Sequence, residues 1–144
     1  MALIEQRHPA FERQMVLWRS CRVGEALPRV SALGPDQLAD LAPVTVLLAR
    51  RSDGPEVFTI VASGAEVDAL YGAPLIGAPA GRLAPVRGDA EQEALSAVET
   101  TRPVLIEDDL RAAGRRRRVA RLYLPLANDD GSPDGVLCGV VALS

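Results

Sequence analysis

The sequence contains no lysine, and all sixteen of its basic residues are arginine. This absence excludes Schiff-base chemistry, a lysine-dependent phosphate-binding loop and any other mechanism that needs a side-chain amine. Aromatic residues make up only 3% of the chain, which disfavours a site that stacks nucleic-acid bases. The net charge is −3, so attraction of nucleic acid by general electrostatics is disfavoured as well.

Ligands for metals and cofactors are also scarce. His8 is the only histidine and falls in the expected N-terminal tail, which disfavours a haem ligand and a metal site of the His/Cys type. Cys21 and Cys138 are expected to be free thiols. The longest apolar run, residues 41–49, is far shorter than the roughly 20 residues that span a bilayer. We therefore expect a cytoplasmic protein without membrane insertion or an export signal.

The 144 residues that are present fit one domain. We expect residues 1–10 to form a tail and residues 11–144 to form the domain. Apolar and amphipathic side chains at spacings of four, three and four predict a first helix over about residues 9–22. These side chains are Phe11, Met15, Trp18 and Arg22.

The order of the remaining segments favours an α+β fold. Residues 44–50 and 56–62 are rich in β-branched side chains and flank a turn signal, which predicts a hairpin. No βαβ repeat appears, so an antiparallel sheet with its helices on one face is expected. The other expected elements are short helices at 35–41 and 65–71, a loop to residue 85, a helix at 89–101 and strands at 104–110, 115–126 and 136–143.

This order resembles the PAS fold, and more specifically the chain resembles the alphaproteobacterial single-domain PAS proteins. The matching pieces are Trp18-Arg19-Ser20, Leu27-Pro28, Tyr71-Gly72, Leu75-Ile76-Gly77, Thr101-Arg102-Pro103-Val104, Leu124-Pro125-Leu126-Ala127 and the segment Asp134 to Gly139. The resemblance implies a five-stranded antiparallel sheet in the order 2-1-5-4-3, an N-terminal amphipathic helix, and middle helices that cover a ligand pocket. It also implies a non-enzymatic sensory or regulatory module of bacterial signal transduction.

Two groups of side chains are the candidate functional residues. An apolar pocket between the sheet and the middle helices is predicted to contain Phe58, Ile60, Leu70, Leu75, Leu122 and Leu124. On the strand at 115–126, Arg121 and Tyr123 are expected to face outward or toward a partner. The side chains of Phe11, Met15 and Trp18 are predicted to form an interface, with packing of the helix against its own sheet as the alternative.

The arginine run from Arg115 to Arg118 has two interpretations. It is either an anion site or one side of a hairpin in which Glu107, Asp108 and Asp109 lie across from Arg118, Arg117 and Arg116. The second interpretation is favoured. Cys138 is expected to be a small core residue. A flavin adduct is disfavoured, because relatives that form one carry the cysteine in a polar Asn-Cys-Arg-Phe-Leu-Gln type segment that this sequence lacks.

Three functions remain open at this stage. The first is a sensor that binds a small apolar ligand, forms a homodimer and contacts an unidentified signalling protein. The second is an adaptor whose core is filled by its own side chains. The third is a small isomerase-like enzyme, which needs a carboxylate or a tyrosine buried in the pocket.

Overall fold

The computed structural model describes residues 8–22, 24, 26–50, 58–85, 89–112, 114–128 and 131–143. Within these ranges five strands form one antiparallel sheet in the order β2-β1-β5-β4-β3, as the resemblance predicted. The strands are β1 (Thr45–Arg50), β2 (Phe58–Ser63), β3 (Val104–Ala112), β4 (Arg115–Leu126) and β5 (Gly135–Ala142). The predicted turn at residues 52–55 lies outside the described residues.

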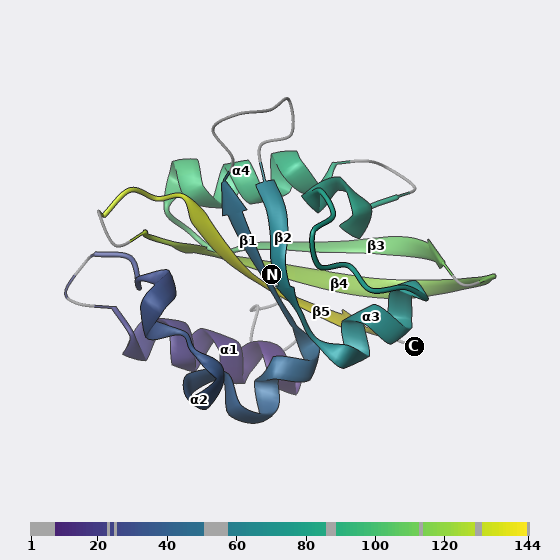
Figure 1. The fold of residues 1–144 in the computed structure, drawn as a ribbon, viewed down its shortest axis with the longest axis horizontal. Coiled ribbons are helices and arrows are strands. Elements are labelled where there is room, and N and C mark those ends of the chain that lie inside the picture. The colour runs from purple at the N-terminus through teal and green to yellow at the C-terminus, as the bar shows by residue number, and fades with distance from the viewer. Residues whose placement is uncertain are drawn as a thin grey trace.

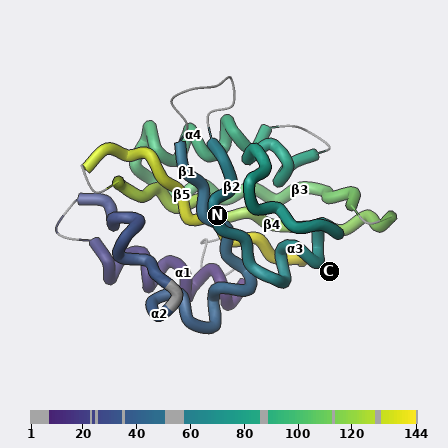
Figure 2. Tube along the Cα trace, in the orientation of Figure 1, coloured from purple at the N-terminus to yellow at the C-terminus, as the bar shows by residue number. Residues whose placement is uncertain are grey.

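Helices cover both faces of the sheet (Figure 1). One face carries α3 (Ala65–Tyr71), the 3₁₀ turn η4 (Ala80–Leu83) and α4 (Ala90–Thr100). The opposite face carries α1 (Pro9–Ser20), with α2 (Pro35–Leu38) and the 3₁₀ segments η2 (Val30–Ala32) and η3 (Ala39–Val44) nearby. The chain trace shows the same division, with α1 and α4 on opposite sides of the strands (Figure 2). We call the face toward α3, η4 and α4 the inner face, and the face toward α1 the outer face.

The N-terminal helix begins with a side-chain cap. His8 Nδ1 accepts a hydrogen bond from the backbone N–H of Ala10 at 3.0 Å, and Pro9 occupies the first turn, where its missing N–H is harmless. His8 therefore belongs to the folded part of the chain and not to a tail.

The apolar stripe of α1 packs against its own sheet. Phe11, Met15 and Trp18 are 0%, 4% and 3% exposed and belong to one cluster with the leucines of β4. The indole N–H of Trp18 also donates to the carbonyl of Pro125 at 2.8 Å. The structure therefore shows the alternative interpretation, in which the helix packs against its own sheet. These three side chains are not on the surface, so the prediction that they form a partner interface is wrong.

Side chains of β4 alternate strictly between the two faces. Ala120, Leu122, Leu124 and Leu126 lie on the outer face, against α1. Val119 and Tyr123 lie on the inner face. The prediction that Leu122 and Leu124 line a pocket under the middle helices is therefore wrong, because the apolar face of this strand is the one that α1 covers.

Candidate functional site

The inner face collects four of the six predicted pocket residues. Phe58, Ile60 and Leu75 are at most 1% exposed and belong to the inner core, and Leu70 packs against that core from α3. Their role in binding a ligand remains a prediction. Leu122 and Leu124 lie across the sheet and cannot share a pocket with them.

The centre of the inner face is charged. Arg121 is 1% exposed, and its guanidinium donates to both carboxylate oxygens of Glu93 on α4, with nitrogen–oxygen distances of 3.0 to 3.2 Å. It also donates to Asp108 Oδ2 on β3 at 3.3 Å. The side chains of Glu93 and Asp108 are only 10% and 3% exposed. One arginine therefore joins α4, β3 and β4 inside the domain.

Two tyrosines complete this group. The Tyr123 hydroxyl donates to Glu93 Oε1 at 2.6 Å and accepts from Arg121 Nε at 3.0 Å. The Tyr71 hydroxyl donates to the carbonyl of Leu83 at 2.6 Å, and Arg121 Nη1 donates to the same carbonyl at 3.4 Å. We call Arg121, Glu93, Asp108, Tyr123 and Tyr71 the Arg121 cluster. It ties α3 and η4 to the charged centre through Leu83.

Burial sets the protonation of the neutral members and of a neighbouring thiol. Desolvation raises the pKa of Tyr123 well above its ordinary value of 10.0 and raises the pKa of Tyr71 in the same direction. Burial also raises the pKa of the Cys138 thiol to about 12. At neutral pH the two hydroxyls are therefore hydrogen-bond donors, and Cys138 is an unreactive thiol in the core, as expected for a small core residue.

The expectation that Arg121 and Tyr123 face outward is wrong. It rested on assigning the single apolar face of β4 to the interior, whereas both faces of this strand are buried. A signal for this was available in the last strand, where every residue from Val136 to Val141 is apolar or glycine. Such a run is typical of a strand covered on both sides, and β4 is the expected neighbour of that strand. Arg121 then requires buried carboxylate partners.

The hairpin of β3 and β4 differs in register from the prediction. Strand β3 continues to Ala112 and β4 begins at Arg115, so the connection is shorter than the predicted turn at 111–114. Asp109 consequently lies opposite Arg118, while Asp108 lies opposite Val119 and turns inward. Asp109 pairs with Arg116 at 3.2 Å and with Arg118 at 3.5 Å. The predicted pairing of Asp109 with Arg116 is confirmed, and Arg118 is a second partner of the same carboxylate.

A comparison with known families identifies the family to which this fold belongs. Residues 6–141 match the family model described as PAS domain. The chain belongs to the PAS domain family. Among the described residues of this PAS domain, no helix is long and apolar enough to cross a membrane, and no group of three or more His, Cys, Asp or Glu side chains is placed to hold a metal.

Solved structures share the fold at low sequence identity. A light-oxygen-voltage domain studied with a flavin analogue is 14% identical, with 76% of this chain and 83% of that chain covered and a TM-score of 0.59. The PAS domain of a protein from Colwellia psychrerythraea is 21% identical over 74% and 94% of the two chains, with a TM-score of 0.55. The PAS domain of the fruit-fly ELK potassium channel is 12% identical over 74% and 91%, with a TM-score of 0.57. No curated protein matches the chain.

Proposed function

We propose that this PAS domain is a non-enzymatic regulatory module of bacterial signal transduction whose interior is filled by its own side chains. It acts through contacts with other proteins, including a second copy of itself. The observation that supports this proposal is the Arg121 cluster, which occupies the space between the sheet and α3, η4 and α4. Of the three functions that the sequence left open, this is the adaptor whose core is filled by its own side chains. Its signalling role is the one that the PAS family implies.

The charges of the cluster argue against an apolar ligand at its position. A ligand that entered between α4 and β4 would separate Arg121 from Glu93 and Asp108. Leaving such charges buried and unpaired costs several kcal/mol, typically about 3–5 when one partner of a buried pair is lost. An apolar molecule offers no hydrogen bonds in return. The interior is therefore better suited to holding its helices in place than to receiving such a ligand.

The isomerase-like alternative requires a buried carboxylate or tyrosine, and the structure contains both. Their chemistry nevertheless supports a structural role. Both carboxylates are bound to Arg121, and the raised pKa values of Tyr71 and Tyr123 keep their protons in place at neutral pH. A general base near neutral pH needs a free lone pair and a pKa close to the working pH. The two carboxylates are engaged by Arg121 and the two hydroxyls keep their protons, so none of these four groups is available as a general base.

The first experiment tests whether the interior is filled. The purified domain is measured by native mass spectrometry and then in a thermal-shift screen of small apolar molecules, beside the variant Phe58→Ala, which changes a fully buried ring of the inner core. Removing this ring opens a cavity, and apolar cavities in protein cores bind small apolar molecules. We expect the native chain to carry no small molecule and to show no shift, whereas Phe58→Ala gains one. A small molecule released in stoichiometric amount from the native chain would refute the filled interior.

The second experiment tests the predicted homodimer. Because Phe11, Met15 and Trp18 are buried, a dimer that uses α1 must use its solvent side, where Val16 is 58% exposed. Val61 on β2 is 46% exposed and provides a matched control on another surface. We expect light scattering to report a dimer that Val16→Glu dissociates and Val61→Glu does not. A monomer at all concentrations contradicts the self-association part of the proposal.

A further inference from the structure

The tip of the β3–β4 hairpin carries positive charge on a chain that is acidic as a whole. The hairpin extends beyond the helices at one end of the molecule (Figure 1). The net charge of the chain is −3, whereas the end of β3 and the start of β4 carry the exposed residues Arg111, Arg115, Arg116 and Arg118. Positive charge gathered on a projecting element raises the local concentration of anions.

The strand register places two of these arginines opposite each other. Arg111 of β3 pairs with Arg116 of β4, and side chains in such a pair have Cβ atoms about 4.5–5.5 Å apart on one face. Like charges in this position destabilise a hairpin. The next pair on the same face, Asp109 with Arg118, combines opposite charges. The hairpin therefore keeps a repulsive pair at its tip, directly beside an attractive one.

The nearby carboxylate is already shared between two arginines. Asp109 pairs with Arg116 at 3.2 Å and with Arg118 at 3.5 Å. Within the described part of the chain, Arg111 makes no side-chain ion pair or hydrogen bond. Glu107, the next acidic residue of this face, lies two residues further from the turn. From Asp109 to the turn, the outer face thus carries three guanidinium groups and one carboxylate.

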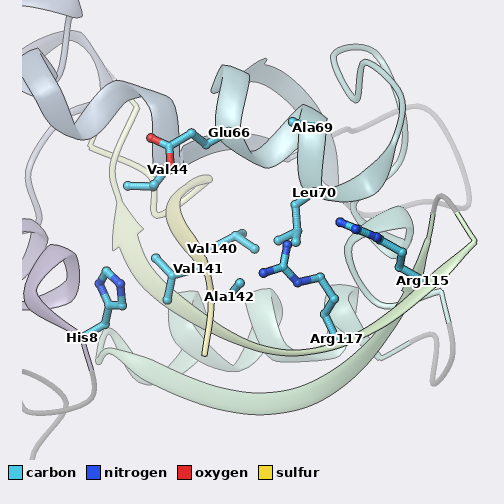
Figure 3. Close-up of a pocket in the computed structure, with 10 residues that line it drawn as sticks. All are labelled: His8, Val44, Glu66, Ala69, Leu70, Arg115, Arg117, Val140, Val141 and Ala142. Atoms are coloured by element: carbon cyan, nitrogen blue, oxygen red, sulfur yellow. The ribbon is translucent and has the colours of Figure 1, made fainter. Parts of the chain in front are cut away.

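The other arginines of the run project from the opposite face. In the close-up, Arg115 and Arg117 extend from β4 toward Leu70 of α3 (Figure 3). This follows from the alternation of side chains along a strand. The charge balance of the outer face therefore does not depend on these two residues.

An open concavity accompanies the opposed pair. Its volume is ≈ 550 Å³, and it is lined by Arg111, Ala112, Gly114, Arg115 and Arg116. This volume falls within the ~300–1,000 Å³ that is usual for small-molecule sites. Among the described residues that line it, the only apolar side chain is the methyl group of Ala112. The concavity is therefore suited to a charged group and not to an aliphatic one.

The opposed pair has the chemistry of an oxyanion site. A guanidinium binds an oxyanion through paired, charge-assisted hydrogen bonds. A phosphate monoester carries about −1.5 to −2 charge at pH 7 and three strong acceptor oxygens, so it can accept hydrogen bonds from two guanidinium groups and neutralise both. A carboxylate carries only one negative charge, which is half of what two arginines require.

We propose that the outer face of the hairpin tip binds a phosphate group between Arg111 and Arg116, with Arg118 as a third donor. Binding of this dianion removes the repulsion within the opposed pair. The proposal deepens the proposed function, on which it rests for its regulatory meaning, because it gives the module a chemical input outside its filled interior. The phosphate group belongs either to a free small molecule or to a phosphorylated side chain of a partner protein.

The test is an NMR titration of the domain with inorganic phosphate at constant ionic strength, in which the backbone amides of Arg111, Gly114 and Arg116 report local binding. The variant Arg111→Gln/Arg116→Gln removes the opposed pair. Its matched control, Arg82→Gln/Arg102→Gln, removes the same charge from two exposed positions outside the hairpin. We expect saturable shifts whose Kd the first variant raises about tenfold or more, and the control less than threefold. The unfolding midpoint of each variant confirms that it is folded.

Two single variants should produce a gain, which a merely solvated surface would not. Asp109→Asn releases Arg116 and Arg118 from their shared carboxylate and should strengthen phosphate binding about threefold or more. Arg111→Gln relieves the repulsion within the opposed pair. It should raise the unfolding midpoint without phosphate by about 1–4 °C, while it weakens phosphate binding.

Four results would overturn the proposal. One is the absence of saturable phosphate shifts at these amides at low ionic strength. Another is equal weakening by both double variants, which would show only general attraction. The third is unchanged or weaker binding by Asp109→Asn, and the fourth is a lower unfolding midpoint of Arg111→Gln. None of these results bears on native mass spectra, on Phe58→Ala or on the dimer, so failure here is separable from failure of the proposed function.

A further arm identifies the source of the phosphate group. Adenosine monophosphate and a phosphoserine hexapeptide are titrated beside inorganic phosphate and the unphosphorylated hexapeptide. A phosphopeptide that binds at least about tenfold tighter than inorganic phosphate, and loses this in Arg111→Gln/Arg116→Gln, supports the site and assigns it to a partner protein. The same gain for the nucleotide supports the site and assigns it to a small molecule. Equal binding of the peptide with and without phosphate counts against the site.

Discussion

Arg121 and Leu122 are neighbours on β4, are 1% and 0% exposed, and lie on opposite faces of the sheet. Leu122 packs among apolar side chains under α1, whereas Arg121 is held by Glu93 and Asp108. The same strand is thus buried by two different kinds of interaction. The outer face is stabilised by the apolar area removed from water. The inner face also buries an apolar cluster, but at Arg121 it depends on the pairing of charges that have already been desolvated.

This difference determines what each face tolerates. Apolar packing accepts side chains of similar volume, since the interaction is not directional. A buried ion pair accepts few changes, because loss of one partner leaves the other charge without water and without a counter-charge. The inner face therefore fixes the positions of α4 and β3 more specifically than the outer face fixes α1.

The strongest test of this comparison places the same side chain at both positions. Arg121→Met leaves Glu93 and Asp108 buried without their cation and should lower the free energy of unfolding by about 3–5 kcal/mol. Leu122→Met conserves volume and polarity and should lower it by less than about 1.5 kcal/mol. Denaturant unfolding of both variants measures the difference.

A triple variant identifies the cause of that loss. Adding Glu93→Gln and Asp108→Asn to Arg121→Met neutralises the stranded carboxylates while keeping their hydrogen-bonding atoms. Most of the lost stability should return. A triple variant no more stable than Arg121→Met would show that the loss arises from packing, and the contrast between the two faces would disappear.

A smaller effect is expected where the outer face touches the strand backbone. Gly139 of β5 lies under the buried side chain of Gln14, and a methyl group added there would overlap the Gln14 carboxamide. Gln14 also donates to Thr45 Oγ1 at 3.0 Å, which holds it in place. Gly139→Ala should therefore displace α1 and cost about 1–3 kcal/mol.

Two further variants decide whether the cost of Gly139→Ala has this origin. Adding Gln14→Ala should recover part of the loss, as a positive coupling between neighbours. Gly81→Ala, where an added methyl group meets nothing, should change stability by less than about 0.5 kcal/mol. If Gly139→Ala proves as mild as Gly81→Ala, close packing of Gln14 on β5 is not a constraint.

Local signals and the family resemblance predicted most of the fold. The helix predicted over 89–101 is observed as Ala90–Thr100, and the strand predicted over 44–50 as Thr45–Arg50. The strand order came from the resemblance, since hairpin signals identify neighbours in sequence and not the strands that close a sheet. Period-two alternation separated the two faces of β4 but did not show which helix covers each face.

The candidate site was missed for a non-local reason. Glu93 and Asp108 lie 28 and 13 positions before Arg121, on a helix and on a neighbouring strand. Their meeting depends on the hairpin register, which depends in turn on a connection whose length the sequence did not specify. A glycine at position 114 is a sequence signal for a tight turn, and in the structure Gly114 has the positive φ of +70 that such turns favour. A turn two residues shorter turns Asp108 inward and leaves Asp109 outside.

Alkaline pH provides a third test, because the buried tyrosines ionise only after unfolding. A hydroxyl whose pKa is raised by folding contributes stability that is complete below its unfolded value, 10.0, and is lost as pH rises above it. Each tyrosine should contribute a loss of up to about 1.4 kcal/mol per pH unit. Tyr71→Phe should therefore flatten the decline in stability above pH 10. An unchanged slope would contradict the assignment of Tyr71 to the buried cluster.

The smallest effect is expected at the exposed end of the same hairpin. Asp109 pairs with Arg116 and Arg118, and the Arg116 guanidinium beside it lowers the pKa of its carboxyl. The contribution of this pairing is complete above the ordinary pKa of the carboxyl and disappears as pH falls through the lowered pKa. Because these side chains are 40% to 64% exposed, solvent screens the attraction. Asp109→Asn should leave the unfolding midpoint at pH 7 nearly unchanged, whereas Asp108→Asn, one residue away and facing Arg121, should lower it clearly. Equal effects of the two substitutions would mean that burial does not distinguish the ion pairs of the two faces.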